Sequence, residues 1–101
     1  MAIEVALQNE RGDFLAVVHD VGNLMPKILE RALPNEPFFA QIDWYGDTVF
    51  NRIQMPRFLS AWQTLAQHVR DDQEKKLVEE IERLAQRCEE SVHLYLRFIG
   101  D

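Results

Sequence analysis

The chain has 101 residues, and its 11 lysine and arginine residues against 17 aspartate and glutamate residues give a formal net charge of −6. This length fits a single domain over residues 1–101, and a composition that is 47% hydrophobic and 28% charged excludes a disordered chain or a collagen-like array. The negative charge disfavours nucleic acid and anionic membranes as partners, and it favours a basic protein.

The low cysteine content and the lack of long apolar segments limit the covalent chemistry and the cellular location of the protein. The single cysteine, Cys88, excludes an internal disulfide and a cysteine-rich metal site. No apolar run approaches the roughly 20 residues of a membrane span. Residues 1–4 do not have the basic and apolar regions of a signal peptide, so we expect a cytoplasmic protein.

The N-terminal segment predicts a β-hairpin. Apolar residues alternate with polar or small ones over residues 3–8, which indicates a half-buried strand. A turn follows over residues 9–13, where Gly12 is suited to a positive φ. The next strand, residues 14–19, is apolar on both faces, and we therefore expect it inside a sheet.

A short helix and a second hairpin are expected next. Asn23 is a favourable N-cap for a helix over residues 24–33, and Pro34 and Pro37 end that helix. Two strands, residues 38–43 and 48–54, then flank a loop over residues 44–47. In this loop Gly46 is expected to be left-handed.

The C-terminal half predicts two helices and a last strand. Pro56 suits the first position of a helix over residues 56–69, whose apolar residues recur every three or four positions. Asp71 and Glu74 have the spacing of a capping box for a helix over residues 71–88. Residues 92–99 are rich in β-branched and aromatic residues and predict a strand.

The resulting order, β-β-α-β-β-α-α-β, predicts an α+β fold with an antiparallel sheet of about five strands and three helices. Because the strands at residues 14–19 and 92–99 are apolar on both faces, both faces of the sheet need cover. Three modest helices leave one face open to self-association or to a partner.

The residues that usually carry catalysis or bind metal do not form a recognisable site. His19 and Asp20 are adjacent on a strand and point to opposite faces, and His19, His68 and His93 have no paired ligand spacing. Cys88 lies in the apolar stripe of a helix, where a buried thiol is inert. We therefore predict no catalytic residue, cofactor or metal.

The loop between the strands of the second hairpin is the strongest candidate for a binding site. Its acidic residues do not match a calcium loop, because Val49 and Phe50 stand where further oxygen ligands are needed. Two aromatic residues at a hairpin tip are typical anchors of a protein interface, and the alternative is that they fold back on the core. The candidate residues are Asp43, Trp44, Tyr45 and Asp47. Arg52 and Arg97, both on predicted strands, are expected to pair with acidic residues on neighbouring strands.

The chain resembles a group of short bacterial proteins at residues 44–52 (WYGDTVFNR), 54–56 (QMP) and 93–101 (HLYLRFIGD). This resemblance implies no known activity, cofactor or catalytic residue. The size, acidity and single α+β domain are also similar to those of immunity proteins that neutralise secreted bacterial toxins, which is an analogy of role.

We therefore expect a small acidic interaction module that is not an enzyme and that blocks a basic partner, as an immunity-type inhibitor does. Its acidic surface would steer the partner, and the aromatic pair would anchor it. Two alternatives stay open. A homodimeric protein similar to secretion chaperones would present apolar sheet surface to an effector, and a small enzyme would use His19 or His93 with a carboxylate.

Overall fold

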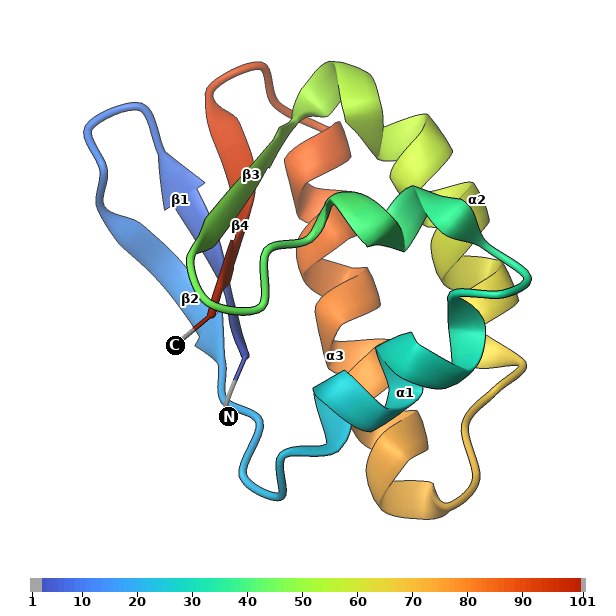
Figure 1. Ribbon diagram of the computed structural model, residues 1–101. Coiled ribbons are helices and arrows are strands. Elements are labelled where there is room, and N and C mark those ends of the chain that lie inside the picture. Colours follow the sequence, from blue (N-terminus) through green and yellow to red (C-terminus); the bar gives the residue numbers. More distant parts are fainter. Residues whose placement is uncertain (1–2, 101) are drawn as a thin grey trace.

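The computed structural model describes residues 3–100, and within them the predicted α+β class, with an antiparallel sheet and three α-helices, is confirmed (Figure 1). The elements in chain order are β1 (Glu4–Asn9), β2 (Phe14–Val18), α1 (Leu24–Ala32), η1 (Pro37–Gln41), β3 (Asp47–Asn51), η2 (Arg52–Gln54), α2 (Met55–Ala66), α3 (Asp72–Glu89) and β4 (Leu94–Ile99), where η marks a 3-10 helix. None of these helices combines the length and hydrophobicity that crossing a membrane requires.

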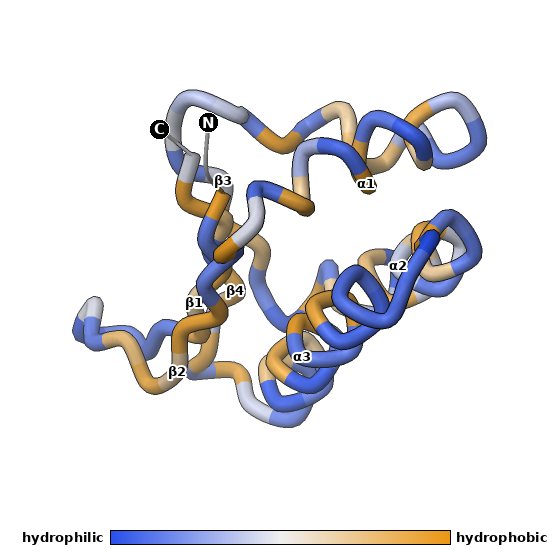
Figure 2. Tube along the Cα trace, turned by 90° about the horizontal axis from the view of Figure 1, so that it is seen from below, coloured by the Kyte–Doolittle hydropathy of each residue, from blue (hydrophilic) through white to orange (hydrophobic). Residues whose placement is uncertain are grey.

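The four strands form one antiparallel sheet in the order β2-β1-β4-β3, and α1, α2 and α3 lie on the same side of it (Figure 2). We call this side the inner face. Val5 and Leu7 of β1 are buried there and pair with Phe98 and Leu96 of β4. Because side chains alternate along a strand, the residues between them point to the opposite, outer face.

The prediction of a strand over residues 38–43 is wrong, and the sheet has four strands instead of about five. This segment forms η1, which Pro37 begins. The Glu36 carboxylate accepts a hydrogen bond from the Phe38 N–H, and the Arg57 guanidinium binds it at 2.7 and 3.0 Å. The hydrogen bond from Arg57 holds the pKa of Glu36 below its usual value. These contacts fix the start of a helical turn in place of an extended segment.

Two further predictions about the sheet are also wrong. The strand over residues 48–54 ends at Asn51, because Asn51 and Gln54 exchange hydrogen bonds between side chain and backbone and so begin η2. The strand over residues 14–19 is expected inside the sheet, but β2 pairs only with β1 and lies at the border. Among residues 3–100, no second strand pairs with the free edge of β2.

The helix starts follow the predicted residues only in part. Asn23 is left-handed and makes no capping hydrogen bond. The buried Asp20 caps α1 instead, since its carboxylate accepts hydrogen bonds from the N–H groups of Leu24 and Met25, both at 2.7 Å. Asp71 caps α3, since its carboxylate accepts a hydrogen bond from the Glu74 N–H, but the predicted capping box is only half formed: the Glu74 carboxylate binds the Arg70 N–H and Arg31 instead.

The two predictions about turn glycines have opposite outcomes. Gly12 adopts a positive φ of 88° and is the only glycine among residues 3–100 that does so. Gly46 does not have the predicted left-handed conformation. The segment before β3 is not a tight hairpin turn, and it therefore does not require a left-handed glycine.

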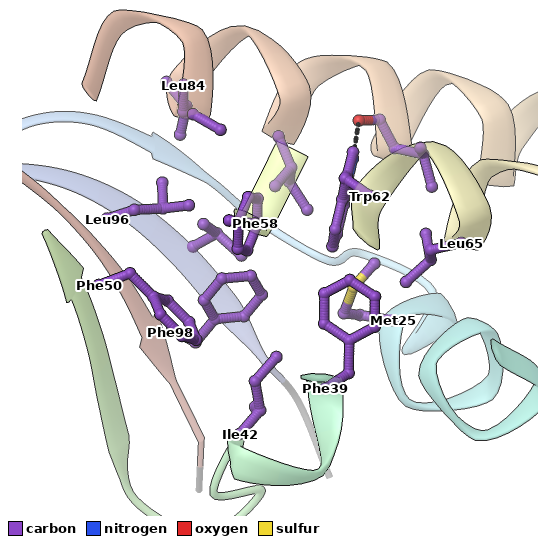
Figure 3. Packing of buried hydrophobic residues seen from close by; sticks show 14 of the residues in the cluster. Met25, Phe39, Ile42, Phe50, Phe58, Trp62, Leu65, Leu84, Leu96 and Phe98 are labelled. Carbon is purple, nitrogen blue, oxygen red and sulfur yellow. Dashed lines mark hydrogen bonds between the residues drawn. The ribbon is translucent and has the colours of Figure 1, made fainter. Parts of the chain in front are cut away.

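The core lies between the inner face and the helices, and an aromatic cluster fills its centre (Figure 3). Phe58 and Trp62 of α2 stack with ring centroids 5.2 Å apart, and Phe98 of β4 packs against both. The indole Nε1 of Trp62 donates to the Val78 carbonyl at 3.0 Å, which ties α2 to α3. Phe39 of η1 completes the cluster, so the residues predicted as a strand supply core side chains from a helical turn.

Candidate functional site

Residues 43–47, which we call the Tyr45 loop, lead from the segment after η1 into Asp47, the first residue of β3, and do not form the predicted hairpin tip (Figure 1). At the start of the loop, the Asp43 N–H donates to Thr48 Oγ1 at 2.8 Å, and the Tyr45 N–H donates to Asp43 Oδ1 at 2.9 Å. Towards its end, the Gly46 carbonyl accepts a hydrogen bond from the Gly100 N–H at 2.7 Å. The loop is thus fastened both to β3 and to the residue after β4.

The two aromatic side chains of the Tyr45 loop lie in different environments. Trp44 is partly buried and packs against the core, as the alternative interpretation proposed. Tyr45 is 74% exposed. The Tyr45 ring is therefore the more accessible of the two to another molecule, and the sequence alone could not distinguish them.

The two carboxylates of the loop also differ. Asp47 forms an ion pair with Arg97 of β4, whose Nε also donates to Gln8 Oε1 at 2.9 Å. Asp43 forms no ion pair within residues 3–100, so its negative charge stays uncompensated. Charge attraction at this loop therefore originates mainly at Asp43.

The predictions for the two strand arginines have opposite outcomes. Arg97 pairs with an acidic residue on the neighbouring strand, as predicted. Arg52 lies in η2 instead of a strand, and its Nε donates to the backbone carbonyl of Glu89 at 3.2 Å. This contact satisfies a carbonyl at the C-terminal end of α3, where a cation is favourable.

The outer face of the sheet carries several exposed apolar side chains. Phe14 and Leu15 of β2 are each about half exposed, and Val17 is 36% exposed. A register shift opposite Leu7 and Gln8 places one extra residue in β2 at this point. On the opposite border, Val49 of β3 is 42% exposed. All three α-helices lie on the inner face, which agrees with the expectation that the helices leave one face of the sheet open (Figure 2).

The histidines lie apart on the surface. His19 contacts the Glu4 carboxylate instead of its neighbour Asp20. His93 contacts Glu10, and the His68 ring lies near the Asn35 side chain. Within residues 3–100, no group of three histidine, cysteine or acidic side chains is placed to hold a metal ion.

An open hollow of about 550 Å³ lies between α1 and the start of α3. Two of its lining residues, Arg31 and Glu74, form an ion pair, in which Arg31 Nη2 lies 2.8 and 2.7 Å from the two Glu74 oxygens. Arg31 Nη1 also donates to the His68 carbonyl. These contacts join α1, the segment before α3 and α3, so we assign the pair a structural role.

Cys88 is fully buried, which confirms the predicted core position. Burial raises the pKa of its thiol to about 11, so at pH 8 the group is almost entirely neutral and is a poor nucleophile. We expect iodoacetamide at pH 8 to label the native protein far more slowly than the urea-unfolded protein. Mass spectrometry would follow the labelling, and native labelling at the unfolded rate would contradict the buried position.

Comparisons of the chain with protein-family models, with curated proteins and with solved structures found no match.

Proposed function

We propose that the protein is a small acidic interaction module that binds a basic protein partner through the Tyr45 loop. The observation that carries the proposal is the exposed Tyr45 ring on a loop that hydrogen bonds fasten near both of its ends. Tyrosine offers a large amphipathic contact area and loses little conformational entropy when it binds. A loop that is already ordered adds little further entropic cost.

Charge supports a basic partner. The net charge of −6 gives the protein an acidic field, which speeds the approach of a positively charged molecule. The uncompensated Asp43 carboxylate, which accepts a hydrogen bond from the Tyr45 N–H, offers a direct contact to a lysine or arginine. Asp47 is shared with Arg97 and contributes less. In this proposal the module blocks its partner by occupying a basic surface, as an immunity-type inhibitor would.

The proposal is tested by replacing Tyr45 with serine. Proteins captured from a lysate of the source cell by the immobilised wild type should be lost with Tyr45→Ser, because truncating an aromatic anchor typically weakens binding by about 2 kcal/mol or more. Quantitative mass spectrometry of the bound fraction provides the readout. Raising the salt concentration should also release the partner, since the attraction between exposed charges is screened.

A matched control is available at the other end of β3. Ile53 is 83% exposed in η2, so Ile53→Ser removes a comparably exposed apolar side chain away from the loop. We expect the Ile53→Ser protein to retain the partner. Equal capture by the wild type and by Tyr45→Ser would refute the assignment of the loop.

A further inference from the structure

Gly100, the residue after β4, lies against the backbone of the Tyr45 loop. A Cβ atom on Gly100 would lie 2.5 Å from the carbonyl carbon of Trp44, nearer still to its oxygen, and 2.9 Å from the carbonyl oxygen of Asp43. Non-bonded carbon atoms normally approach one another to about 3.5–4.0 Å. Because these neighbours are all backbone atoms, no side-chain rotation can make room for a Cβ atom. The contact therefore requires glycine at position 100.

The requirement for this glycine comes from space and not from backbone conformation. Among the glycines of residues 3–100, Gly12 has a positive φ and Gly100 does not. An alanine at position 100 would thus meet no strain from a left-handed backbone. The Gly100 N–H also donates to the Gly46 carbonyl at 2.7 Å. A close approach and a hydrogen bond therefore hold the same two segments together.

We propose that Gly100 sets the position of the Tyr45 loop and thereby the presentation of the Tyr45 ring to a partner. The part about presentation rests on the proposed function, and the part about the position of the loop does not. Asp43 and Trp44, whose carbonyl groups lie next to Gly100, directly precede Tyr45. The Tyr45 N–H is bonded to Asp43 Oδ1 at 2.9 Å. A shift of these two carbonyl groups is therefore passed on to Tyr45.

The end of β4 is held more firmly than the loop. β4 lies between β1 and β3 in the sheet, and Ile99 pairs with a residue of each neighbouring strand. Phe98 is fully buried in the aromatic cluster. Residues 43–46 belong to no helix or strand. A side chain at position 100 should therefore displace the loop and leave β4 in place.

The variant Gly100→Ala tests the proposal, and Gly22→Ala is its matched control. Gly22 also has no positive φ, and the atoms nearest to a Cβ there would be side-chain atoms of Leu24, at 3.4 Å or more. Both variants replace glycine by alanine and so change the unfolded chain in the same way. A difference between them then reflects the contact at Gly100.

NMR of the free ¹⁵N-labelled protein gives a readout that needs no partner. In Gly100→Ala we expect the amide signals of residues 43–47 to shift, while the signals of α2 and α3 stay unchanged. The N–H groups of Asp43 and Tyr45 should also exchange with solvent faster, because their hydrogen bonds hold the loop. Gly22→Ala should leave all of these signals unchanged. A Gly100→Ala protein with unchanged loop signals, or one that no longer folds, would overturn the proposal.

Capture of the partner separates this inference from the proposed function. We expect Gly100→Ala to bind the partner about tenfold more weakly than the wild type, because a displaced loop loses its preorganisation, and Gly22→Ala to bind it normally. Full binding by Gly100→Ala, with binding lost in Tyr45→Ser, would refute the presentation of Tyr45 by Gly100 and leave the proposed function standing. Full binding by Tyr45→Ser would refute the proposed function, and the NMR comparison would still decide whether Gly100 positions the loop.

Discussion

Replacing Trp62 with alanine should lower the free energy of unfolding by about 4 kcal/mol, within the range seen when a large aromatic side chain is removed from a core. Trp62 is fully buried and packs against Phe39, Phe58 and Phe98 (Figure 3). The substitution also leaves the Val78 carbonyl without its side-chain hydrogen bond. Urea unfolding followed by circular dichroism would measure the change.

The conservative variant Trp62→Phe separates packing from hydrogen bonding. It keeps an aromatic ring in the cluster and loses only the indole N–H and part of the volume. We expect it to lose clearly less stability than Trp62→Ala. A loss below about 1 kcal/mol for Trp62→Ala would contradict the central position of this ring in the core.

Replacing Glu74 with glutamine should lower the free energy of unfolding by about 3 kcal/mol, because breaking a buried ion pair leaves one charge uncompensated. The Glu74 side chain is 7% exposed, and that of its partner Arg31 is 18% exposed. One Glu74 oxygen also accepts a hydrogen bond from the Arg70 N–H at 2.9 Å. The pair therefore holds α1 and the segment before α3 to the first turn of α3, and urea unfolding would measure its loss.

Two further variants test this explanation. The double variant Arg31→Met with Glu74→Leu removes both charges together, and it should recover much of the lost stability because no isolated charge remains. Glu82→Gln removes a half-buried carboxylate charge from the same helix but keeps an oxygen that can accept the hydrogen bond from Gln63, so it should change the stability by less than about 0.5 kcal/mol. Equal losses for Glu74→Gln and Glu82→Gln would contradict a buried pair.

Periodicity predicted the long helices well and the short apolar segments poorly. The apolar stripes of residues 56–69 and 71–88 extend over several turns, and α2 and α3 form there. Residues 38–43 contain only a short apolar run, which fits a strand or a buried helical turn equally well. The contacts that decide for η1 include the pairing of Glu36 with Arg57, which is 21 residues away. A local pattern carries no information about such a partner.

The composition of β2 predicted its position in the sheet wrongly. A strand that is apolar on both faces usually lies inside a sheet, yet β2 lies at the border. Strand order depends on pairings between distant segments, such as that of β1 with β4. The mismatch between composition and position became visible only with the topology.

The sequence indicated which residues form the candidate site but not which of them are exposed and which are paired. The aromatic and acidic residues of the loop were identified from their types alone. Which aromatic ring faces the solvent depends on the path of the chain between η1 and β3. The pairing of Asp47 with Arg97 joins residues 50 positions apart, and it depends on the register of β3 with β4. Long-range geometry therefore separates the exposed Tyr45 from the partly buried Trp44, and Asp43 from the ion-paired Asp47.

The most direct test of the proposed function is an NMR titration of the ¹⁵N-labelled protein with its captured partner. The proposal predicts that the amide signals of residues 43–49 shift or broaden first, together with that of Gly100, whose N–H is bonded to the loop. Signals of the outward side of α3 should stay unchanged. Perturbations confined to α3, with the Tyr45 loop unaffected, would contradict the proposal that this loop is the binding site.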